Sequence, residues 1–189
     1  MSNFLEIKKK INPFNKTLSI EGDKSLSIRW ALLASQAKGK SISYNLLKSE
    51  DVLNTLICLK KLGVKVKVFK NKCEIISKGL NSFNYKKNLT LYAGNSGTLA
   101  RLILGLLIHS NNKIRIKGDK SLSKRDFFRV INPLKSFGAK FKSKNGKLPL
   151  EIIGTNYARP IKYFENKGSA QCKSSVMLAA LNTEGTTII

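Results

Sequence analysis

The chain has 189 residues, of which 42% are hydrophobic, so it is long enough to form one domain with a substantial core. It contains no run of eighteen apolar residues that would span a membrane, and its first ten residues lack the apolar stretch of a secretory signal. We therefore expect a cytoplasmic protein that has no membrane partner.

The formal net charge is +24, from 35 Lys and Arg residues against 11 Asp and Glu residues. A charge of this size is typical of proteins that bind nucleic acids. The lysines, however, are spread along the whole chain and form no basic block with interleaved aromatic residues. The pattern predicts no nucleic-acid partner and suits small anions that carry several charges.

The cysteines and the single histidine indicate neither a disulfide framework nor a zinc site. Cys58, Cys73 and Cys172 are odd in number, widely spaced and outside any C-x-x-C pattern. We predict that they are reduced thiols in or near the core. His109 falls near the end of an apolar helix, where a polar cap is expected.

The first elements of the chain surround the stretch Gly22–Arg29. Strands are expected at residues 4–7 and at Thr17–Ile20, and a helix over Ser25–Ala37, capped by Ser25 or Asp23 and ended by Lys38-Gly39. A strand, a glycine turn and a helix start present backbone N–H groups and a positive dipole end to an anion. Lys24, Ser25 and Arg29 would converge there. The alternative is an ordinary capped helix with solvated Lys and Arg side chains.

The chain then continues with alternating strands and helices. The remaining expected elements of this unit are a strand at Ser41–Tyr44, a helix capped at Ser49–Asp51 and ended by Gly63, and strands at Val64–Val68 and Cys73–Ile76. The next unit has strands at Leu89–Tyr92 and Lys113–Ile116, helices at Leu99–Ile108 and Asp126–Phe137, and a hairpin of Ala139–Phe141 with Leu150–Ile153.

Equivalent positions recur at a fixed spacing. Thr98 follows Ser25 by 73 residues, and Gln171 follows Thr98 by 73 residues. Such a period indicates repeated β-α-β-α-β-β units. The third unit has a strand at Ile161–Phe164, a helix at Cys172–Leu181 and a strand at Gly185–Ile189. It lacks its second helix and hairpin, so we expect the sequence to be a fragment of a longer protein or a truncated product.

If the units pack around a common axis, the starts of their first helices converge on one cleft. This predicts a site for a polyanion. Its residues would be Lys24, Ser25 and Arg29 from the first unit, Asn95, Gly97, Thr98 and Arg101 from the second, and Ser169, Gln171 and Lys173 from the third. The alternative is three ordinary capped helices in a repeat scaffold.

Four motifs of the chain resemble, in order and spacing, those of the 5-enolpyruvylshikimate-3-phosphate (EPSP) synthase family. They are Gly22–Arg29, Gly94–Thr98 with Arg101, Gly118–Arg125, and Ser169–Gln171 with Lys173-Ser174. The resemblance covers essentially all of this chain but under half of a typical family member.

The resemblance implies an α/β (α+β) fold, an inside-out α/β barrel built from β-α-β-α-β-β repeats, of which this chain holds about two and a half. It implies that residues 1–18 are strands that belong to the other domain. Residues 19–189 would be an incomplete substrate-binding domain with repeats at 19–87, 88–158 and 159–189.

The resemblance also implies an activity. The family transfers the enolpyruvyl group of phosphoenolpyruvate to the 5-hydroxyl of shikimate 3-phosphate, releases phosphate, and uses no metal or organic cofactor. It serves aromatic amino acid biosynthesis through chorismate, and the full-length protein is expected to be a monomer. The general acid and base carboxylates lie in the other half of family members, so no catalytic residue is assigned here and the chain alone is expected to be inactive.

Binding roles carry over by position. The resemblance implies that shikimate 3-phosphate contacts Lys24, Ser25, Arg29, Ser169 and Gln171. It implies that phosphoenolpyruvate contacts Lys24, Gly97, Arg125 and Gln171. Supporting roles fall to Asp51, Asn95, Thr98 and Arg101. Asp126 departs from the family, which has proline there, and an acid beside Arg125 would compete with phosphate.

Three other interpretations stay open. The sister transferase that acts on a UDP-amino sugar shares the fold but lacks the pattern of Gly22–Arg29. A basic RNA-binding repeat protein would explain the net charge, and its binding would depend on salt. A degraded, non-catalytic remnant of an EPSP synthase would retain the same motifs.

Overall fold

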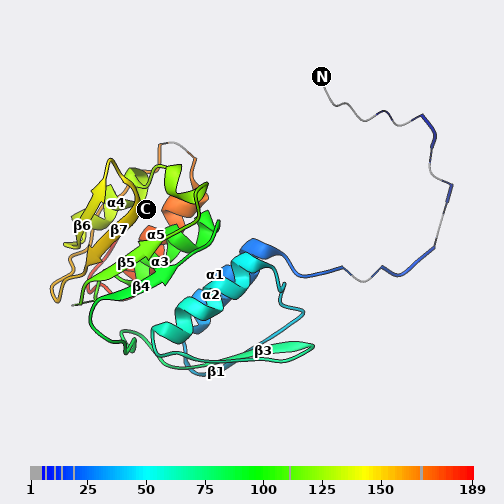
Figure 1. Cartoon of the computed structure of the whole chain (residues 1–189), viewed down its shortest axis with the longest axis horizontal. Helices are drawn as coiled ribbons and strands as arrows, with labels where there is room; N and C mark the ends of the chain where they lie inside the picture. The colour runs from blue at the N-terminus through cyan, green and yellow to red at the C-terminus, as the bar shows by residue number, and fades with distance from the viewer. Residues whose placement is uncertain are drawn as a thin grey trace.

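The structure is a computed structural model that describes residues 6, 8–10, 12–13, 15–18, 20–110, 112–166 and 168–189 (Figure 1). The helices are α1 (Lys24–Ala34), α2 (Glu50–Lys61), α3 (Gly97–Leu106), α4 (Phe128–Ser136) and α5 (Ala170–Ala180), with a short 3₁₀ helix η1 (Leu122–Lys124). The strands are β1 (Lys38–Tyr44), β2 (Lys65–Val68), β3 (Lys72–Lys78), β4 (Leu89–Tyr92), β5 (Ile114–Lys117), β6 (Lys140–Lys144) and β7 (Lys147–Ile153).

The described strands form two sheets with related topology. Their orders are β1-β3-β2 and β4-β5-β7-β6, and β4 pairs with β5 in parallel while all other pairs are antiparallel. The order β1-β3-β2 matches β5-β7-β6 of the second sheet. An isolated parallel bridge between Lys162 and Ile188 in the third unit corresponds to the β4–β5 pair. The element order therefore repeats, as the period of the sequence predicts.

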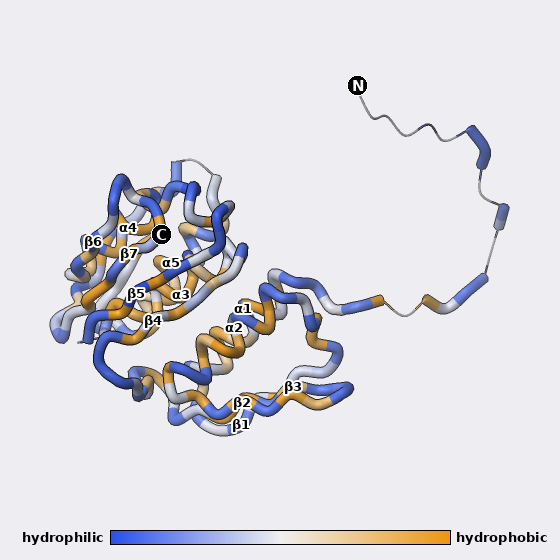
Figure 2. Tube along the Cα trace, in the orientation of Figure 1, coloured by the Kyte–Doolittle hydropathy of each residue, from blue (hydrophilic) through white to orange (hydrophobic). Residues whose placement is uncertain are grey.

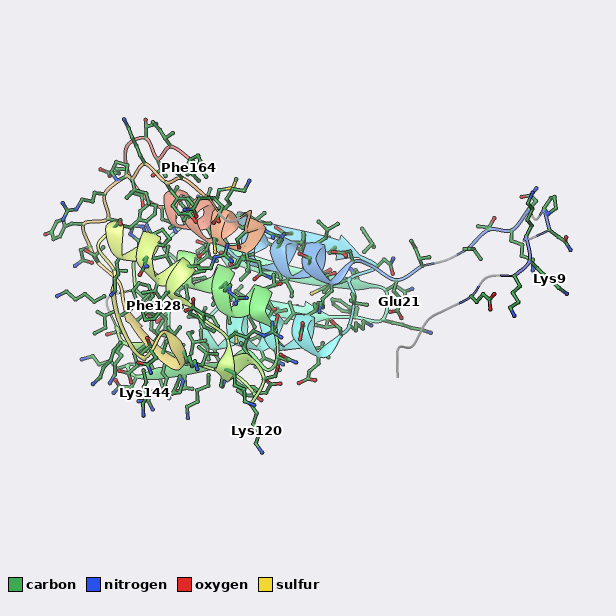
Figure 3. The ribbon with its side chains drawn as sticks, turned by 90° about the horizontal axis from the view of Figure 1, so that it is seen from above. Lys9, Glu21, Lys120, Phe128, Lys144 and Phe164 are labelled. Atoms are coloured by element: carbon green, nitrogen blue, oxygen red, sulfur yellow. The ribbon has the colours of Figure 1, made fainter. Side chains whose placement is uncertain are left out.

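Two predicted strands need a different description. Residues 4–7 lie outside the described residues except Glu6, and the described residues of Thr17–Ile20 belong to no strand. In the third unit a single bridge replaces the two predicted strands. Figure 3 shows Lys9 far from the folded body and Glu21 at its edge. A strand needs a hydrogen-bonded neighbour, and the described part of the chain offers none to residues 15–18.

At its N-terminus helix α1 uses one of the two predicted caps, and at its C-terminus it ends earlier than predicted. Its N-cap is Asp23, whose Oδ1 accepts a hydrogen bond from the Leu26 backbone N–H at 2.7 Å, and not Ser25, which lies inside the helix. The helix ends at Ala34 and not at Ala37. Lys38 and Gly39 belong to β1, where Gly39 has a φ of +104° and pairs with Ser77. The glycine thus starts a strand instead of ending the helix.

One continuous hydrophobic core joins the helices to the inner faces of both sheets. Figure 2 shows the hydrophobic stretches of α1 and α2 next to the alternating pattern of β2 and β3. Helix α3 lies at the centre of the core, because eight of its ten residues are buried. Cys58, Cys73 and Cys172 are buried and free, as predicted, and burial raises the pKa of the Cys58 thiol to about 11.

Two residues predicted as polar caps lack a side-chain hydrogen bond. Ser49 occupies the N-cap position of α2, but its buried hydroxyl makes no hydrogen bond within the described structure. The buried Nε2 of His109 likewise has no partner among the described residues, and burial lowers the pKa of this imidazole. None of the helices in the described ranges has the length and apolar character needed to cross a membrane.

Helices α3 and α5 run side by side in the same direction. Thr98 contacts Gln171 at one end, and further along Gly105 lies against Ser175 and Ala179. A Cβ atom on Gly105 would lie 2.1 Å from the Ser175 carbonyl oxygen, which is far inside contact distance. Glycine at this position therefore sets the close approach of the two helices.

We predict that Gly105→Ala destabilises the chain by about 2 kcal/mol, because overpacking of a tight contact costs about 1–3 kcal/mol. Helix propensity alone predicts the opposite sign, a gain of about 1 kcal/mol. Urea unfolding followed by circular dichroism measures the difference. A stability equal to or above that of the unmodified chain would contradict the close approach.

Candidate functional site

The first helices of the three units begin with matching caps. Asp23 caps α1, the Ser96 hydroxyl accepts from the Leu99 N–H of α3 at 3.2 Å, and the Ser169 hydroxyl accepts from the Cys172 N–H of α5 at 3.3 Å. No acidic residue occupies the first turn of any of these helices. The Asp23 carboxylate offsets the positive dipole end of α1, whereas the uncharged serine caps leave the positive ends of α3 and α5 without a counter-charge.

Side chains connect α1 to α5. The Arg29 guanidinium donates through Nε to the Ser25 hydroxyl at 3.3 Å and through one terminal nitrogen to the Ser174 hydroxyl of α5. Lys24, on the same helix start, lies 3.1 Å from the Asp51 carboxylate at the start of α2. The Lys24 side chain remains 54% exposed, so a ligand can still reach its ammonium group.

A second set of contacts connects α3 to α5. Arg101 donates to Gln171 Oε1 at 2.8 Å, and Gln171 Nε2 donates to the Thr98 hydroxyl at 3.1 Å. The two bonds fix the orientation of the Gln171 amide, because its oxygen must face the guanidinium. One Nε2 hydrogen of Gln171 then stays available to an acceptor.

Arg101 is held on three sides. Its guanidinium carbon lies 5.1 Å from the centre of the Phe127 ring, and a terminal nitrogen donates to the Asp126 carbonyl oxygen at 3.3 Å. Burial lowers the pKa of Arg101, and the charges of Arg125 and Arg129 act in the same direction. The group stays protonated at neutral pH. A bound anion would relieve this repulsion between like charges.

Gly97 lies between two guanidinium groups. A Cβ atom on Gly97 would lie 2.8 Å from a terminal nitrogen of Arg101 and 3.0 Å from one of Arg125. Arg125 in turn donates to Asn95 Oδ1 at 3.2 Å. Two arginines and the N–H groups of the α3 start therefore surround one position, where a phosphate would receive paired hydrogen bonds.

The hexapeptide Gly-Asp-Lys-Ser-Leu-Ser occurs twice in the chain, at 22–27 and at 118–123. The two aspartates make equivalent hydrogen bonds. Asp119 Oδ1 accepts from the Leu122 N–H at 2.7 Å, as Asp23 Oδ1 does from the Leu26 N–H. The Asp119 N–H also donates to the Gly94 carbonyl at 2.9 Å, which docks the second copy beside Gly97 and brings Arg125 there. Figure 3 shows Lys120 pointing away from the body, unlike Lys24.

The structure thus brings together most residues that the sequence singled out. Those linked by side-chain hydrogen bonds or ion pairs are Lys24, Ser25, Arg29, Asp51, Asn95, Thr98, Arg101, Arg125 and Gln171. Ser169 caps α5, and Gly97 lies at the start of α3. The exposed Lys173 side chain makes no hydrogen bond or ion pair within the described structure.

Sequence reasoning missed Phe127 as part of the site, and it placed Ser174 in a motif without giving it a site role. The signal for Ser174 was its distance of 73 residues from Arg101, which makes the two positions equivalent in the repeat.

Asp126 also behaves differently from expectation. Its carboxylate accepts from the Phe128 N–H at 2.8 Å, while Arg125 binds Asn95, so the two adjacent charges form no direct pair.

Within the described ranges, no three or more His, Cys, Asp or Glu side chains gather in a way that could hold a metal ion. The positions that the arrangement does build suit anions. Helix N-termini come from all three units, and the cationic groups in contact come from the first two. Among the residues described, Asp51 is the one carboxylate that pairs with a lysine or arginine predicted to bind substrate.

Comparison with known proteins identifies the family to which this chain belongs. Residues 8–189 match the model of the family EPSP synthase (3-phosphoshikimate 1-carboxyvinyltransferase). The chain is 43% identical over 190 residues to the 3-phosphoshikimate 1-carboxyvinyltransferase of Ruthia magnifica subsp. Calyptogena magnifica, covering 100% of this chain and 43% of that protein. It is 37% identical over 185 residues to the enzyme of that name from Streptococcus pyogenes serotype M1, again covering 43% of the relative.

A solved structure of EPSP synthase from Acinetobacter baumannii superimposes with a TM-score of 0.84 at 34% identity, over 90% of this chain and 39% of that one. The chain therefore spans less than half the length of these relatives. Its units are part of the same inside-out α/β fold. The chain belongs to the EPSP synthase (3-phosphoshikimate 1-carboxyvinyltransferase) family.

Proposed function

We propose that this chain supplies one half of an enzyme that transfers the enolpyruvyl group of phosphoenolpyruvate to the 5-hydroxyl of shikimate 3-phosphate, releasing phosphate. The observation that carries the proposal is the meeting of three helix N-termini, with their Lys, Arg, Ser and Gln side chains joined across units. Membership of the family supports the same reaction.

The shikimate 3-phosphate side is assigned to Lys24, Ser25, Arg29, Ser169 and Gln171. The link from Arg29 to both Ser25 and Ser174 supports this, because it orients a guanidinium between the first and third units. Ser25 and Ser169 hold hydroxyl groups at two helix starts, where the N–H groups also favour a phosphate. Lys24 adds a point charge that can face either substrate.

The phosphoenolpyruvate side is assigned to Lys24, Gly97, Arg125 and Gln171. The bare backbone at Gly97 lets a phosphate approach the start of α3, flanked by Arg101 and Arg125. Asn95 positions Arg125, Thr98 and Arg101 position Gln171, and Asp51 positions Lys24. These four residues are proposed to support the groups that touch substrate.

The complete protein is proposed to act as a cytoplasmic monomer on these two small anions, without a nucleic-acid or membrane partner. The repeats are proposed to span 19–87, 88–158 and 159–189, with residues 1–18 belonging to the other domain. The acid and base of the reaction are proposed to lie in the part of the family's length that this chain does not cover, since the chain spans 43% of the Ruthia magnifica relative.

We predict that the 189-residue chain alone releases no phosphate from a mixture of both substrates. Catalysis needs groups that close over the substrates and exclude water, and those assigned here only bind. A phosphate-release assay checks this, with the full-length Ruthia magnifica relative as the positive control. Phosphate release that disappears on Lys24→Met would contradict the prediction.

Binding measurements can distinguish the shikimate 3-phosphate side of the site from the phosphoenolpyruvate side. We predict that Arg29→Met weakens binding of shikimate 3-phosphate about tenfold or more, since charged hydrogen bonds contribute about 1.5–3 kcal/mol. Phosphoenolpyruvate binding to the chain saturated with shikimate 3-phosphate should change less than about twofold, because no bond is lost there. Arg125→Met should show the reverse pattern, so each variant controls for the other in calorimetry.

Lys140→Met, on the edge strand β6, is the control for a general loss of positive charge and should leave both affinities unchanged. Equal effects of all three variants would argue against a defined site. Saturable binding of a UDP-amino sugar without binding of shikimate 3-phosphate would instead support the sister transferase. Salt-dependent RNA binding alone would support the RNA-binding interpretation.

Asp126→Asn is predicted to strengthen phosphoenolpyruvate binding by about two- to fivefold at low salt, because a negative charge beside Arg101 and Arg125 opposes an anion. Asparagine retains the acceptor for the Phe128 N–H, so stability should be nearly constant. Calorimetry at two salt concentrations measures the change. Glu184→Gln, at an exposed position, is the control. Unchanged affinity would show that the Asp126 charge does not reach the ligand.

A further inference from the structure

We infer that Ser174 is a positioning residue for Arg29, so that the shikimate 3-phosphate site is assembled across the first and third units. This inference rests on the proposed function of Arg29. The Ser174 hydroxyl accepts a hydrogen bond from a terminal nitrogen of Arg29, although the two residues lie 145 positions apart.

The direction of this hydrogen bond is fixed by a neighbour. The Ser174 hydroxyl donates its own hydrogen to the Ala170 carbonyl one helical turn earlier, at 2.7 Å. Its oxygen lone pairs are therefore left to face the guanidinium. A serine in this state presents an acceptor to Arg29 without any competing donor role.

Among the described residues, the side chain of Arg29 makes hydrogen bonds only to Ser25 and Ser174. Beyond Ser25, the cavity beside it is an apolar groove of about 210 Å³ between α1 and α5. The groove is lined by Arg29, Leu33, Leu102, Ser174, Met177, Leu178 and Leu181. Among these residues only Ser174 offers a polar side chain to the guanidinium. Arginine loses much rotamer freedom when it is fixed, so a second hydroxyl prepares it for a ligand before binding.

A second polar link between the segments that follow these two helices provides a matched control. Asn182 Nδ2 donates to Gln36 Oε1 at 3.4 Å, and each of these residues lies two positions after the end of its helix, α5 or α1. Ser174–Arg29 thus joins the two helices near their middles, and Asn182–Gln36 joins the segments just past their C-terminal ends. Only the first link involves a group that is assigned to the ligand.

Removing the Ser174 hydroxyl should cost little structurally. The Ala170 carbonyl that it contacts lies in the exposed first turn of α5, and Arg29 is only partly buried and remains open to water. Ser174→Ala therefore tests the orientation of Arg29 with little effect on folding. Ser174→Thr restores a hydroxyl that can make the same backward bond within the helix.

The experiment compares Ser174→Ala, Ser174→Thr and Asn182→Ala in the whole 189-residue chain, with shikimate 3-phosphate as the probe. Calorimetry should show binding about five- to twentyfold weaker for Ser174→Ala, near-normal binding for Ser174→Thr, and no change for Asn182→Ala. Solvent exchange of the terminal Nη–H protons of Arg29, which donate to Ser174, should be faster in Ser174→Ala alone when followed by NMR.

Two results would overturn the inference. One is shikimate 3-phosphate binding by Ser174→Ala within twofold of the unmodified chain, and the other is an equal loss in Asn182→Ala. If the unmodified chain binds no shikimate 3-phosphate, the proposed function fails, and the NMR measurement decides on the positioning. Unchanged Arg29 exchange in Ser174→Ala then rejects it, and faster exchange that Ser174→Thr reverses supports it.

Discussion

The close approach of α3 and α5 is the contact on which the rest of the site depends. Gly105 has no side chain, so the backbone of α5 can lie directly against α3 near Ser175. Because the helices are parallel, this contact also sets the distance between their N-termini. Thr98 and Arg101 can then hold Gln171 from two sides. A buried glycine far from the helix starts thus determines the geometry of the groups that face an anion.

The electrostatics of the site oppose folding and favour binding. Arg101 and Arg125 both approach Gly97, and the pKa of Arg101 is lowered by burial and, to a smaller extent, by the charges of Arg125 and Arg129. Repulsion of this kind reduces the stability of the folded chain, and an anion that enters the site removes it. The stacking of Arg101 on Phe127 and its bond to the Asp126 carbonyl offset part of the cost. Functional sites commonly contain groups whose interactions reduce the stability of the fold, as these arginines do.

Much of this arrangement could be predicted from the sequence, because it is encoded locally. Apolar periodicity located the helices, and the 73-residue spacing of Ser25, Thr98 and Gln171 indicated their equivalence. The features that could not be predicted depend on the surrounding structure. Ser25 and Asp23 are both good caps, and only the backbone geometry selects Asp23. The strand expected at Thr17–Ile20 requires a partner that the described residues do not provide. The contact of Arg29 with Ser174 joins residues 145 apart, which no local pattern reveals.

The duplicated hexapeptide has a consequence for how such motifs should be interpreted. In both copies the aspartate closes the turn by the same bond, at the same 2.7 Å, although an α-helix begins within the first copy and a short 3₁₀ helix begins within the second. The lysine in each copy has no such fixed role. Lys24 meets a carboxylate supplied by another helix, whereas Lys120 extends into solvent. The second copy of the hexapeptide therefore reproduces the turn, but its lysine can become part of a binding site only where a neighbouring unit supplies a partner for it.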